Sequence, residues 1–227
     1  MRITIFDRAL AAPKRHRDGT HRASAPAATI ARARRAMKPL GITRLANLTG
    51  LDTIGIPVWS AIRPNGRSLS VSQGKGLTDE HAQASALMES IETWHAENVA
   101  LPRRRGTVAA MRTRARVVDV RGLARVAPLP RDRVHEWVEG WDLVAGEPIW
   151  VPLEAVTLDT VFARPPVFDV SSNGLASGNH VLEAIVHGLT EVIERDAEAQ
   201  WRAERGDRRV DPETITGPGR ALMARLL

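Results

Sequence analysis

Carboxylates at helical spacing are the residues of this sequence best suited to do chemistry. On a helix expected over residues 79–98, Ser85, Glu89 and Glu92 fall within about 60° of one another. A second helix, expected over residues 179–203, carries a polar stripe about 120° wide that consists of Asn179, Glu183, His187, Glu191, Glu194 and Glu198. Mg²⁺ is usually bound through one or two carboxylates and through substrate phosphates. Two such helices facing each other would therefore suit Mg²⁺ held against a nucleotide.

A solvated helix face is the competing interpretation of either stripe. Like charges three or four residues apart destabilise a helix by roughly a few tenths of a kcal/mol per pair unless something compensates them. Neither stripe is expected to have a cation at a compensating position, and Arg195 is placed at the far edge of the second one. Because a divalent cation would provide the compensation, the pattern favours a metal site.

The remaining motifs exclude several other kinds of site. The chain has no Cys, which excludes disulfides, thiolate metal sites and a cysteine nucleophile. Gly74-Lys75-Gly76 is not a Walker A loop, because Leu69 stands where the first glycine should be and Gly76 follows the lysine. The dinucleotide-binding G-x-G-x-x-G, the zinc motif H-E-x-x-H and the nucleophile elbow G-x-S-x-G are also missing. His95 and His187 are interpreted as packed or solvent-bridged residues rather than as ligands.

The elements around the two helices predict an α+β fold, with a mixed β-sheet packed against long helices. Residues 171–178, which lead into the second long helix, suit either an anion at the helix N-terminus or a plain helix entry. Residues 103–116 hold six arginines and no acid, and are expected to form an exposed loop or crossover. Strands are expected over residues 54–62, 68–72, 117–120, 135–142, 148–152 and 167–170, and shorter helices over residues 29–38 and 219–227.

Composition and charge narrow the class of protein. The chain has 227 residues, of which 43% are hydrophobic and 26% charged, as in globular proteins. No run of 18 apolar residues and no signal peptide are recognisable, so we expect a cytoplasmic protein without a membrane partner. The whole chain has a net charge of +6, and the first 44 residues, with eleven Lys and Arg against two Asp, carry +9, so the remainder carries −3. We interpret residues 1–38 as a basic, partly flexible arm rather than as a nucleic-acid surface, because it lacks interleaved aromatic residues.

Six segments follow one another along the chain: GITRLANLTGLD (41–52), GIPVW (55–59), SQGKG (72–76), SALMESIE (85–92), SNGLASGN (172–179) and EVIERD (191–196). In this order they resemble the YcaO family, and the resemblance covers about residues 39–196. Residues 41–59 are most similar to the subgroup that works beside TfuA-like partner proteins.

The resemblance implies an ATP-binding fold without a Walker loop, in which helix carboxylates hold Mg²⁺ on the phosphates. Family members phosphorylate the oxygen of a peptide backbone amide, and a side chain or a sulfur donor then gives an azoline or a thioamide. The site residues that the family implies are assigned to this sequence through two of its motifs. The first is S-x-x-x-E-x-x-E, and the second is N-x-x-x-E followed by E-x-x-E-R. The implied metal ligands are Glu89, Glu92, Glu183, Glu191 and Glu194; the implied nucleotide contacts are Ser85, Lys75, Asn179, Glu183 and Arg44; and Arg195 is implied as the catalytic residue, together with Glu191 and Glu194.

The same resemblance implies that the substrate is a peptide or protein, which is modified after translation or during natural-product biosynthesis. It also implies a partner protein, either TfuA-like or leader-binding. Thioamide formation is favoured over azoline formation, and a homodimer is one arrangement left open. Family chains of this type continue well beyond the E-x-x-E-R motif, so residues 39–227 are expected to be the N-terminal portion of a truncated YcaO-like domain. The alternative is a non-catalytic accessory or scaffold protein, for example a helper for ribosomal-protein modification, or an inactive fragment.

Overall fold

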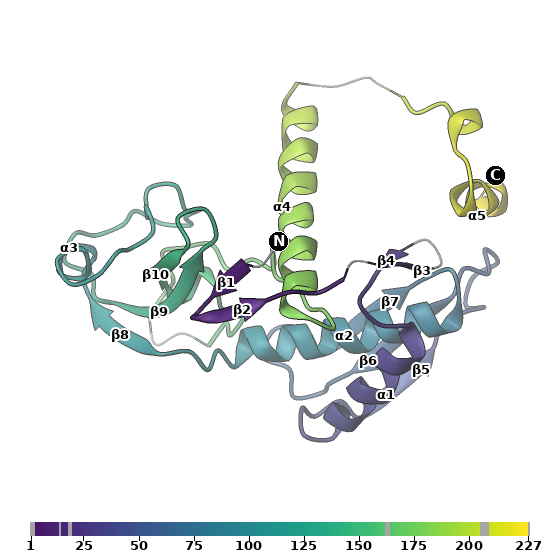
Figure 1. The fold of residues 1–227 in the computed structure, drawn as a ribbon, viewed down its shortest axis with the longest axis horizontal. Helices are drawn as coiled ribbons and strands as arrows, with labels where there is room; N and C mark the ends of the chain where they lie inside the picture. Colours follow the sequence, from purple (N-terminus) through teal and green to yellow (C-terminus); the bar gives the residue numbers. More distant parts are fainter. Residues whose placement is uncertain (1–2, 14, 18–19, 162–163, 205–208, 227) are drawn as a thin grey trace. The chain divides into compact units, whose positions relative to one another are not determined.

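The computed structural model describes residues 3–13, 15–17, 20–161, 164–204 and 209–226 (Figure 1). It contains helices and antiparallel sheets, which confirms the predicted α+β class. The packing divides the chain into two compact units, each with its own hydrophobic core. Unit 1 comprises Met1–Ala11 and Thr93–Ser172, and unit 2 comprises Ala12–Glu92 and Asn173–Leu227.

Unit 2 is built on a three-stranded antiparallel sheet in the order β5-β6-β7. Its strands are β5 (Arg44–Asn47), β6 (Val58–Ile62) and β7 (Val71–Lys75), so each strand pairs with the next one along the chain. Residues 63–70, which include a turn at Pro64-Asn65, connect β6 to β7. The strands expected at 54–62 and 68–72 therefore exist, but β6 begins after Pro57 and β7 continues to Lys75.

Two helices pack against this sheet. α1 (Pro26–Met37) has proline in its first turn, where the missing N–H would have no partner in the helix. α2 (Asp79–Glu97) begins after Thr78, whose hydroxyl accepts a hydrogen bond from the His81 N–H at 3.3 Å. The core between these elements is formed by Ile30, Ala33, Ile42, Ala61, Ala86 and Leu87.

The backbone of β7 lies very close to the backbone of α2 at Gly74. A Cβ atom built on Gly74 would lie 2.1 Å from the Ala82 carbonyl oxygen and 2.2 Å from the Ala86 nitrogen. Both atoms belong to helix backbone, so a side chain at position 74 would have to displace the helix. Glycine at this position is therefore a packing requirement.

The longest helix of unit 2, α4 (Val181–Ala203), has Gly188 as its one buried residue. A Cβ atom on Gly188 would lie 2.6 Å from the Gly174 carbonyl oxygen, so the segment before α4 folds back onto the helix at this point. Large apolar side chains along α4 stay accessible, and Ile193 is 66% exposed. Beyond α4 lie a short 3₁₀ turn, η2 (Pro212–Thr214), and α5 (Pro218–Leu226).

Unit 1 contains a second antiparallel sheet, in the order β10-β9-β8. Its strands are β8 (Arg103–Gly106), β9 (His135–Asp142) and β10 (Glu147–Pro152); α3 (Val108–Arg112) follows β8 and the 3₁₀ turn η1 (Leu153–Ala155) follows β10. The core consists of Met111, Val120, Trp137, Trp150, Val167 and Phe168. β8 and α3 lie where an exposed loop was expected, so that expectation is wrong.

Two other strands expected in unit 1 are reduced to isolated bridges. Val117 pairs with Trp150 in parallel, and Phe168 pairs with Arg125. All pairings between the named strands are antiparallel, so the parallel component of the expected mixed sheet is limited to the bridge at Val117. Apolar residues of these two segments, Val120, Val167 and Phe168, contribute to the core of unit 1 instead.

The segment expected to be a flexible basic arm contains regular structure. β1 (Ile3–Ile5) and β2 (Arg8–Leu10) form a hairpin in unit 1, with the Phe6 ring 5.3 Å from that of Trp141. β3 (His16–Arg17) and β4 (Thr20–His21) form a shorter hairpin in unit 2, ahead of α1. The domain boundary after residue 38 remains a prediction. No helix among the described residues is long and apolar enough to cross a membrane.

Gly74→Ala is expected to lower the free energy of unfolding by about 1–3 kcal/mol. The added methyl group would overlap the backbone of α2, which is rigid and cannot move aside. The measurement is urea or thermal unfolding of both proteins. Gly122→Ala is the matched control, because a Cβ atom there would meet its nearest neighbour, the Asp119 carbonyl oxygen, at an ordinary 3.6 Å. Equal stability of the two variants would contradict the packing requirement at Gly74.

Candidate functional site

The two acidic helices face one pocket, which lies entirely within unit 2. It has a volume of about 340 Å³ and is bounded by α2, by α4 with the segment that precedes it, and by residues 22–29. Six of the residues selected from the sequence line it: Ser85, Glu89, Glu92, Asn179, Glu183 and Glu191. The predicted convergence of the two helices is therefore present in the structure.

Carboxylates in this pocket are costly to ionise. Burial, with a smaller contribution from the negative charges of Glu89 and Glu191, raises the pKa of Glu92 to about 7, against hydrogen bonds from Ser177. Burial also raises the pKa of Glu89, against the hydrogen bond from the Gln73 backbone and the positive charge of Lys75. Glu89, Glu92 and Glu191 thus place negative charge close together in one part of the pocket.

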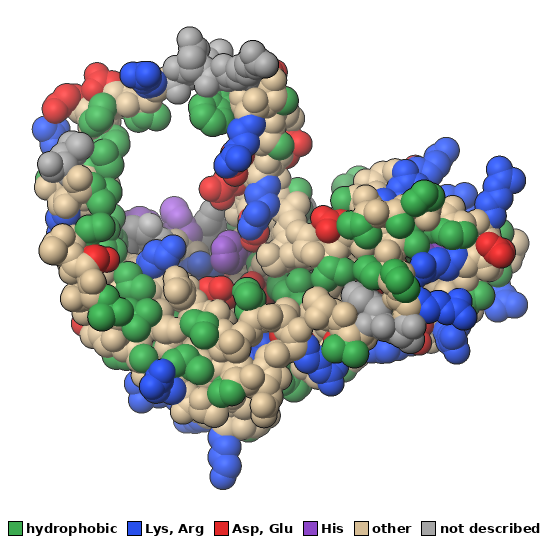
Figure 2. All heavy atoms as spheres, turned by 180° about the vertical axis from the view of Figure 1, so that it is seen from behind, with side chains coloured by type: hydrophobic (Ala, Val, Ile, Leu, Met, Phe, Trp, Pro, Cys, Tyr) green, Lys and Arg blue, Asp and Glu red, His purple; other side chains and the backbone are tan. Residues whose placement is uncertain are grey.

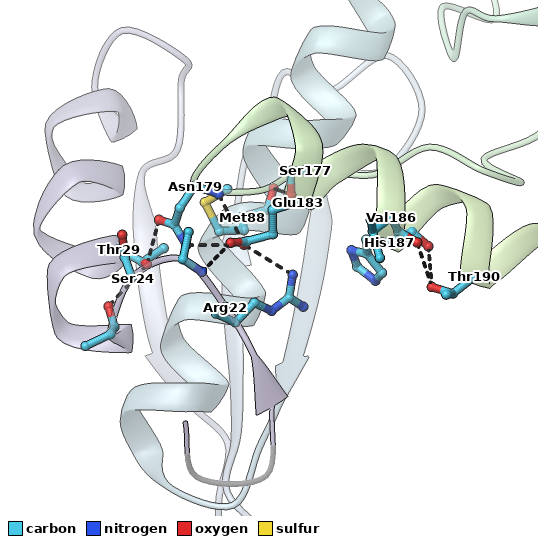
Figure 3. A network of polar contacts seen from close by, with 12 residues as sticks. Arg22, Ser24, Thr29, Met88, Ser177, Asn179, Glu183, Val186, His187 and Thr190 are labelled. Atoms are coloured by element: carbon cyan, nitrogen blue, oxygen red, sulfur yellow. Dashed lines mark hydrogen bonds and ion pairs between the residues drawn. The ribbon is translucent and has the colours of Figure 1, made fainter. Parts of the chain in front are cut away.

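Glu183 is in the opposite situation. Its side chain is 9% exposed and accepts a hydrogen bond from the Ala23 N–H at 2.6 Å and from the Arg22 guanidinium at 3.4 Å (Figure 3). Asn179 donates to the same carboxylate from its backbone at 3.2 Å and from its side chain at 3.4 Å. Although burial opposes the shift most strongly, these donors together lower the pKa of Glu183. Glu183 is therefore an ionised residue with its acceptors largely occupied.

Asn179 links α4 to α1 through its side-chain oxygen. Thr29 donates to this oxygen at 2.8 Å, and the guanidinium of Arg32 also donates to it. The start of α4 is fixed by His180, whose Nδ1 accepts from the Leu182 N–H at 3.1 Å. The loop before α4, α1 and the residues leading into α1 are thereby joined at one edge of the pocket (Figure 3).

Four of the selected residues do not line this pocket. Lys75 lies close enough to Glu89 to lower its pKa, and Arg44 is exposed at the start of β5. Glu194 is exposed on α4. Arg195 binds Glu191, with 2.8 Å between its Nε and the carboxylate.

The expectation that the second stripe lacks compensating cations is wrong. Arg195 pairs with Glu191, and Arg202 pairs with Glu198 at 2.5 Å, both at i,i+4 spacing. Arg22 adds a third pair with Glu183, from a distant part of the sequence. Positive charge thus accompanies Glu183, Glu191 and Glu198 on α4.

Sequence reasoning missed several residues of this site. Arg22, Ser24 and Thr29 line the pocket but lie in or beside the segment expected to be an arm. The partner of Arg22 is Glu183, 161 residues away, and the partner of Thr29 is Asn179, 150 residues away, so no local spacing could reveal them. His81 and His187 also line the pocket; His187 belongs to the polar stripe expected on the second helix, whereas His81 was not among the residues selected from the sequence.

Comparison with known proteins identifies the family. Residues 73–226 match the family model of the YcaO cyclodehydratases, which are described as ATP- and Mg²⁺-binding. This chain belongs to the YcaO family.

Relatives and solved structures agree with the YcaO assignment. The chain is 44% identical over 200 residues to a protein encoded in the tfuA 3′ region of Rhizobium leguminosarum bv. trifolii, matching 86% of this chain and 48% of that one. Its fold matches YcaO from Methanopyrus kandleri bound with AMPPCP and Mg²⁺, with a TM-score of 0.64, 28% identity, and coverage of 85% of this chain and 50% of that one. A heterocyclase in complex with substrate and cofactor gives a TM-score of 0.78 at 23% identity, covering 96% of this chain and 34% of the other. The chain spans about half the length of the curated relatives it matches.

The YcaO pocket fits Mg²⁺ bound together with phosphates. Among the residues that the structure describes, no three His, Asp or Glu side chains come close enough to hold a metal ion by themselves. The charges of Glu89 and Glu191 nevertheless act on Glu92, so the three carboxylates lie near one another in the pocket. This donor set suits a hard cation that takes one or two carboxylates and completes its coordination with phosphate and water oxygens.

Glu92→Gln is expected to stabilise the ligand-free protein at pH 8 but not at pH 4.5. Because the folded state raises the pKa of Glu92 from 4.5 to about 7, its stabilising contribution is complete below pH 4.5 and is lost as the pH rises through 7. The neutral amide avoids that loss. Thermal unfolding from pH 4.5 to 8.5 without Mg²⁺ or nucleotide measures the difference.

Glu198→Gln is the control for this titration, since Glu198 is half exposed and ion-paired on the same helix. It should show no gain in melting temperature at pH 8. A gain from Glu92→Gln that is the same at both ends of the pH range would contradict the assignment of the titration to Glu92.

Proposed function

We propose that this chain binds Mg-ATP in the pocket between α2, α4 and residues 22–29, for ATP-dependent activation of a peptide backbone amide. The observation that carries the proposal is the cluster of Glu89, Glu92 and Glu191 in one pocket, with raised pKa values at Glu89 and Glu92. Membership of an ATP- and Mg²⁺-binding family makes a nucleotide-bound Mg²⁺ the fitting ligand for these carboxylates.

Within this proposal the carboxylates divide into two groups. Glu89, Glu92 and Glu191 are proposed to face the cation, because all three line the pocket and the charges of Glu89 and Glu191 act on Glu92. Glu183 takes a positioning role, since its oxygens already bind Ala23 and Arg22. It thereby holds the Arg22 guanidinium at the pocket, where it can bind phosphate oxygens.

The remaining selected residues have supporting roles. Ser85 and Asn179 line the pocket and are proposed to orient phosphates or ligands. Lys75 and Arg195 act through the carboxylates they neighbour, Glu89 and Glu191. Arg44 and Glu194 lie outside the pocket lining, so their roles as nucleotide and metal contacts are supported by the motif match alone.

When bound, Mg-ATP supplies a phosphoryl group for the oxygen of the peptide amide. The protein's contribution would be to hold the phosphates in line and to place cations where negative charge develops. We propose thioamide formation as the outcome, with a TfuA-like partner, because a relative 44% identical is encoded in a tfuA 3′ region. Azoline formation, with a leader-binding partner, is the second outcome.

A non-catalytic accessory role, in which the pocket binds Mg-ATP without turnover, is the competing function. Mg-ATP binding without turnover in any mixture with peptide and partner would support this role. Turnover by the chain would exclude it.

Glu89→Gln and Glu191→Gln are each expected to weaken Mg-ATP binding at least tenfold. Both substitutions remove a charge that faces the cation while retaining the shape of the side chain. Calorimetry of the 227-residue chain measures the affinity, and circular dichroism checks the fold. Glu198→Gln, which changes the same charge on α4 away from the pocket, should bind like the wild type. Unchanged affinity in both pocket variants would refute the proposed site.

Arg22→Ala is expected to weaken Mg-ATP binding roughly tenfold, which corresponds to about 1.4 kcal/mol. The loss has two sources: a phosphate contact and the ion pair that orders Glu183. Arg35→Ala removes an exposed arginine of α1 outside the pocket lining and serves as the control. The same calorimetric titration compares them, and equal affinities would exclude Arg22 from the nucleotide site.

A further inference from the structure

β8 forms the open edge of the unit 1 sheet. β9 lies in the middle of the order β10-β9-β8, and β8 pairs with it from Arg103 to Gly106. The opposite edge is covered, because the Trp150 N–H donates to the Arg116 carbonyl at 2.9 Å and the Val118 N–H donates to the Trp150 carbonyl at 3.0 Å. Across the part of the chain described here, no strand pairs with the outer side of β8.

Three consecutive exposed arginines line this edge: Arg103, Arg104 and Arg105. Two of them are held in place by neighbours on β9 and β10. The Arg104 guanidinium lies 4.2 Å from the centre of the Trp150 ring, and Arg103 binds Glu136 at 3.2 Å. In Figure 2, Lys and Arg side chains stand out over the part of the molecule that contains unit 1.

Such an edge discriminates between the strands that could pair with it. Charged side chains on an edge strand commonly prevent edge-to-edge aggregation. A second copy of β8 would place arginine next to arginine, and like charges opposite each other destabilise a pair of strands. An extended acidic strand would instead meet a cation at successive positions on both faces of the sheet.

We propose that the outer edge of β8 binds an extended acidic segment of a second polypeptide, which joins the sheet as a fourth strand. Backbone hydrogen bonds along the edge would hold the segment, as in other cases of strand addition. Carboxylates on one face of the added strand pair with Arg103 and Arg105, and those on the other face lie near Arg104. The proposal concerns unit 1 and is independent of the nucleotide pocket.

The test uses the full 227-residue chain and a fluorescein-labelled peptide of ten residues that alternates Glu and Thr. Fluorescence anisotropy is expected to show saturable binding, and a matched Lys-Thr peptide should not bind. The same Glu-Thr peptide with N-methyl groups on alternate backbone nitrogens should bind at least tenfold more weakly, because it cannot form the hydrogen bonds of a strand. Equal binding of the methylated peptide would overturn strand addition.

The double variant Arg103→Glu/Arg105→Glu is expected to bind the peptide at least tenfold more weakly. Arg121→Glu/Arg131→Glu makes the same charge change at two other exposed arginines of unit 1 and should keep wild-type affinity. An equal loss in both double variants would overturn the assignment to β8. So would an oligonucleotide of equal charge that displaces the peptide at equal concentration, since this would indicate a general polyanion surface.

Hydrogen exchange keeps the proposal falsifiable if the double variant does not fold. Saturating Glu-Thr peptide should slow exchange of wild-type amides within residues 103–106 at least tenfold. Unchanged exchange there, with the peptide bound, would place the binding elsewhere and overturn the proposal.

Discussion

The placement of Glu89, Glu92 and Glu191 in one partly buried pocket is the constraint on which the organisation of this site depends. Burial and, to a smaller extent, the neighbouring negative charges make ionisation of Glu92 costly. The fold opposes this cost through the Gln73 N–H and Lys75 at Glu89, Ser177 at Glu92, and Arg195 at Glu191. The pKa values of Glu89 and Glu92 nevertheless stay raised. Holding these carboxylates between α2 and α4 therefore has an electrostatic cost that a bound cation would reduce.

The attachment of α4 to the rest of unit 2 is mainly polar. Gly188 is the one buried residue of this 23-residue helix, so burial of apolar side chains contributes little to its position. Hydrogen bonds from Ala23, Arg22, Thr29 and Arg32 instead converge on Glu183 and Asn179 near its N-terminus. The residues ahead of α1 therefore help to align the acidic stripe of α4 with that of α2.

Much of the pocket could be predicted from the sequence, because periodicity identifies long helices and the faces on which their acids lie. Pairings between distant segments could not: Arg22 meets Glu183 across 161 residues. β8 was missed because three consecutive arginines show neither alternation nor β-branched side chains, and the strand depends on its pairing with β9. The Glu191–Arg195 pair, by contrast, could have been predicted, because the two residues stand at i,i+4 spacing in the sequence.

The packing of Gly74 also determines what its presence in a related sequence indicates. The glycine before Lys75 is fixed by the backbone of α2 rather than by a ligand, since Ala82 and Ala86 leave no space for a Cβ atom. A descendant that had lost nucleotide binding would still need this glycine in order to fold. Retention of the G-K-G signature in a homologous sequence is therefore a marker of shared architecture and a poor marker of retained catalysis. Loss of the pocket carboxylates would be the more informative sign of a degenerate enzyme.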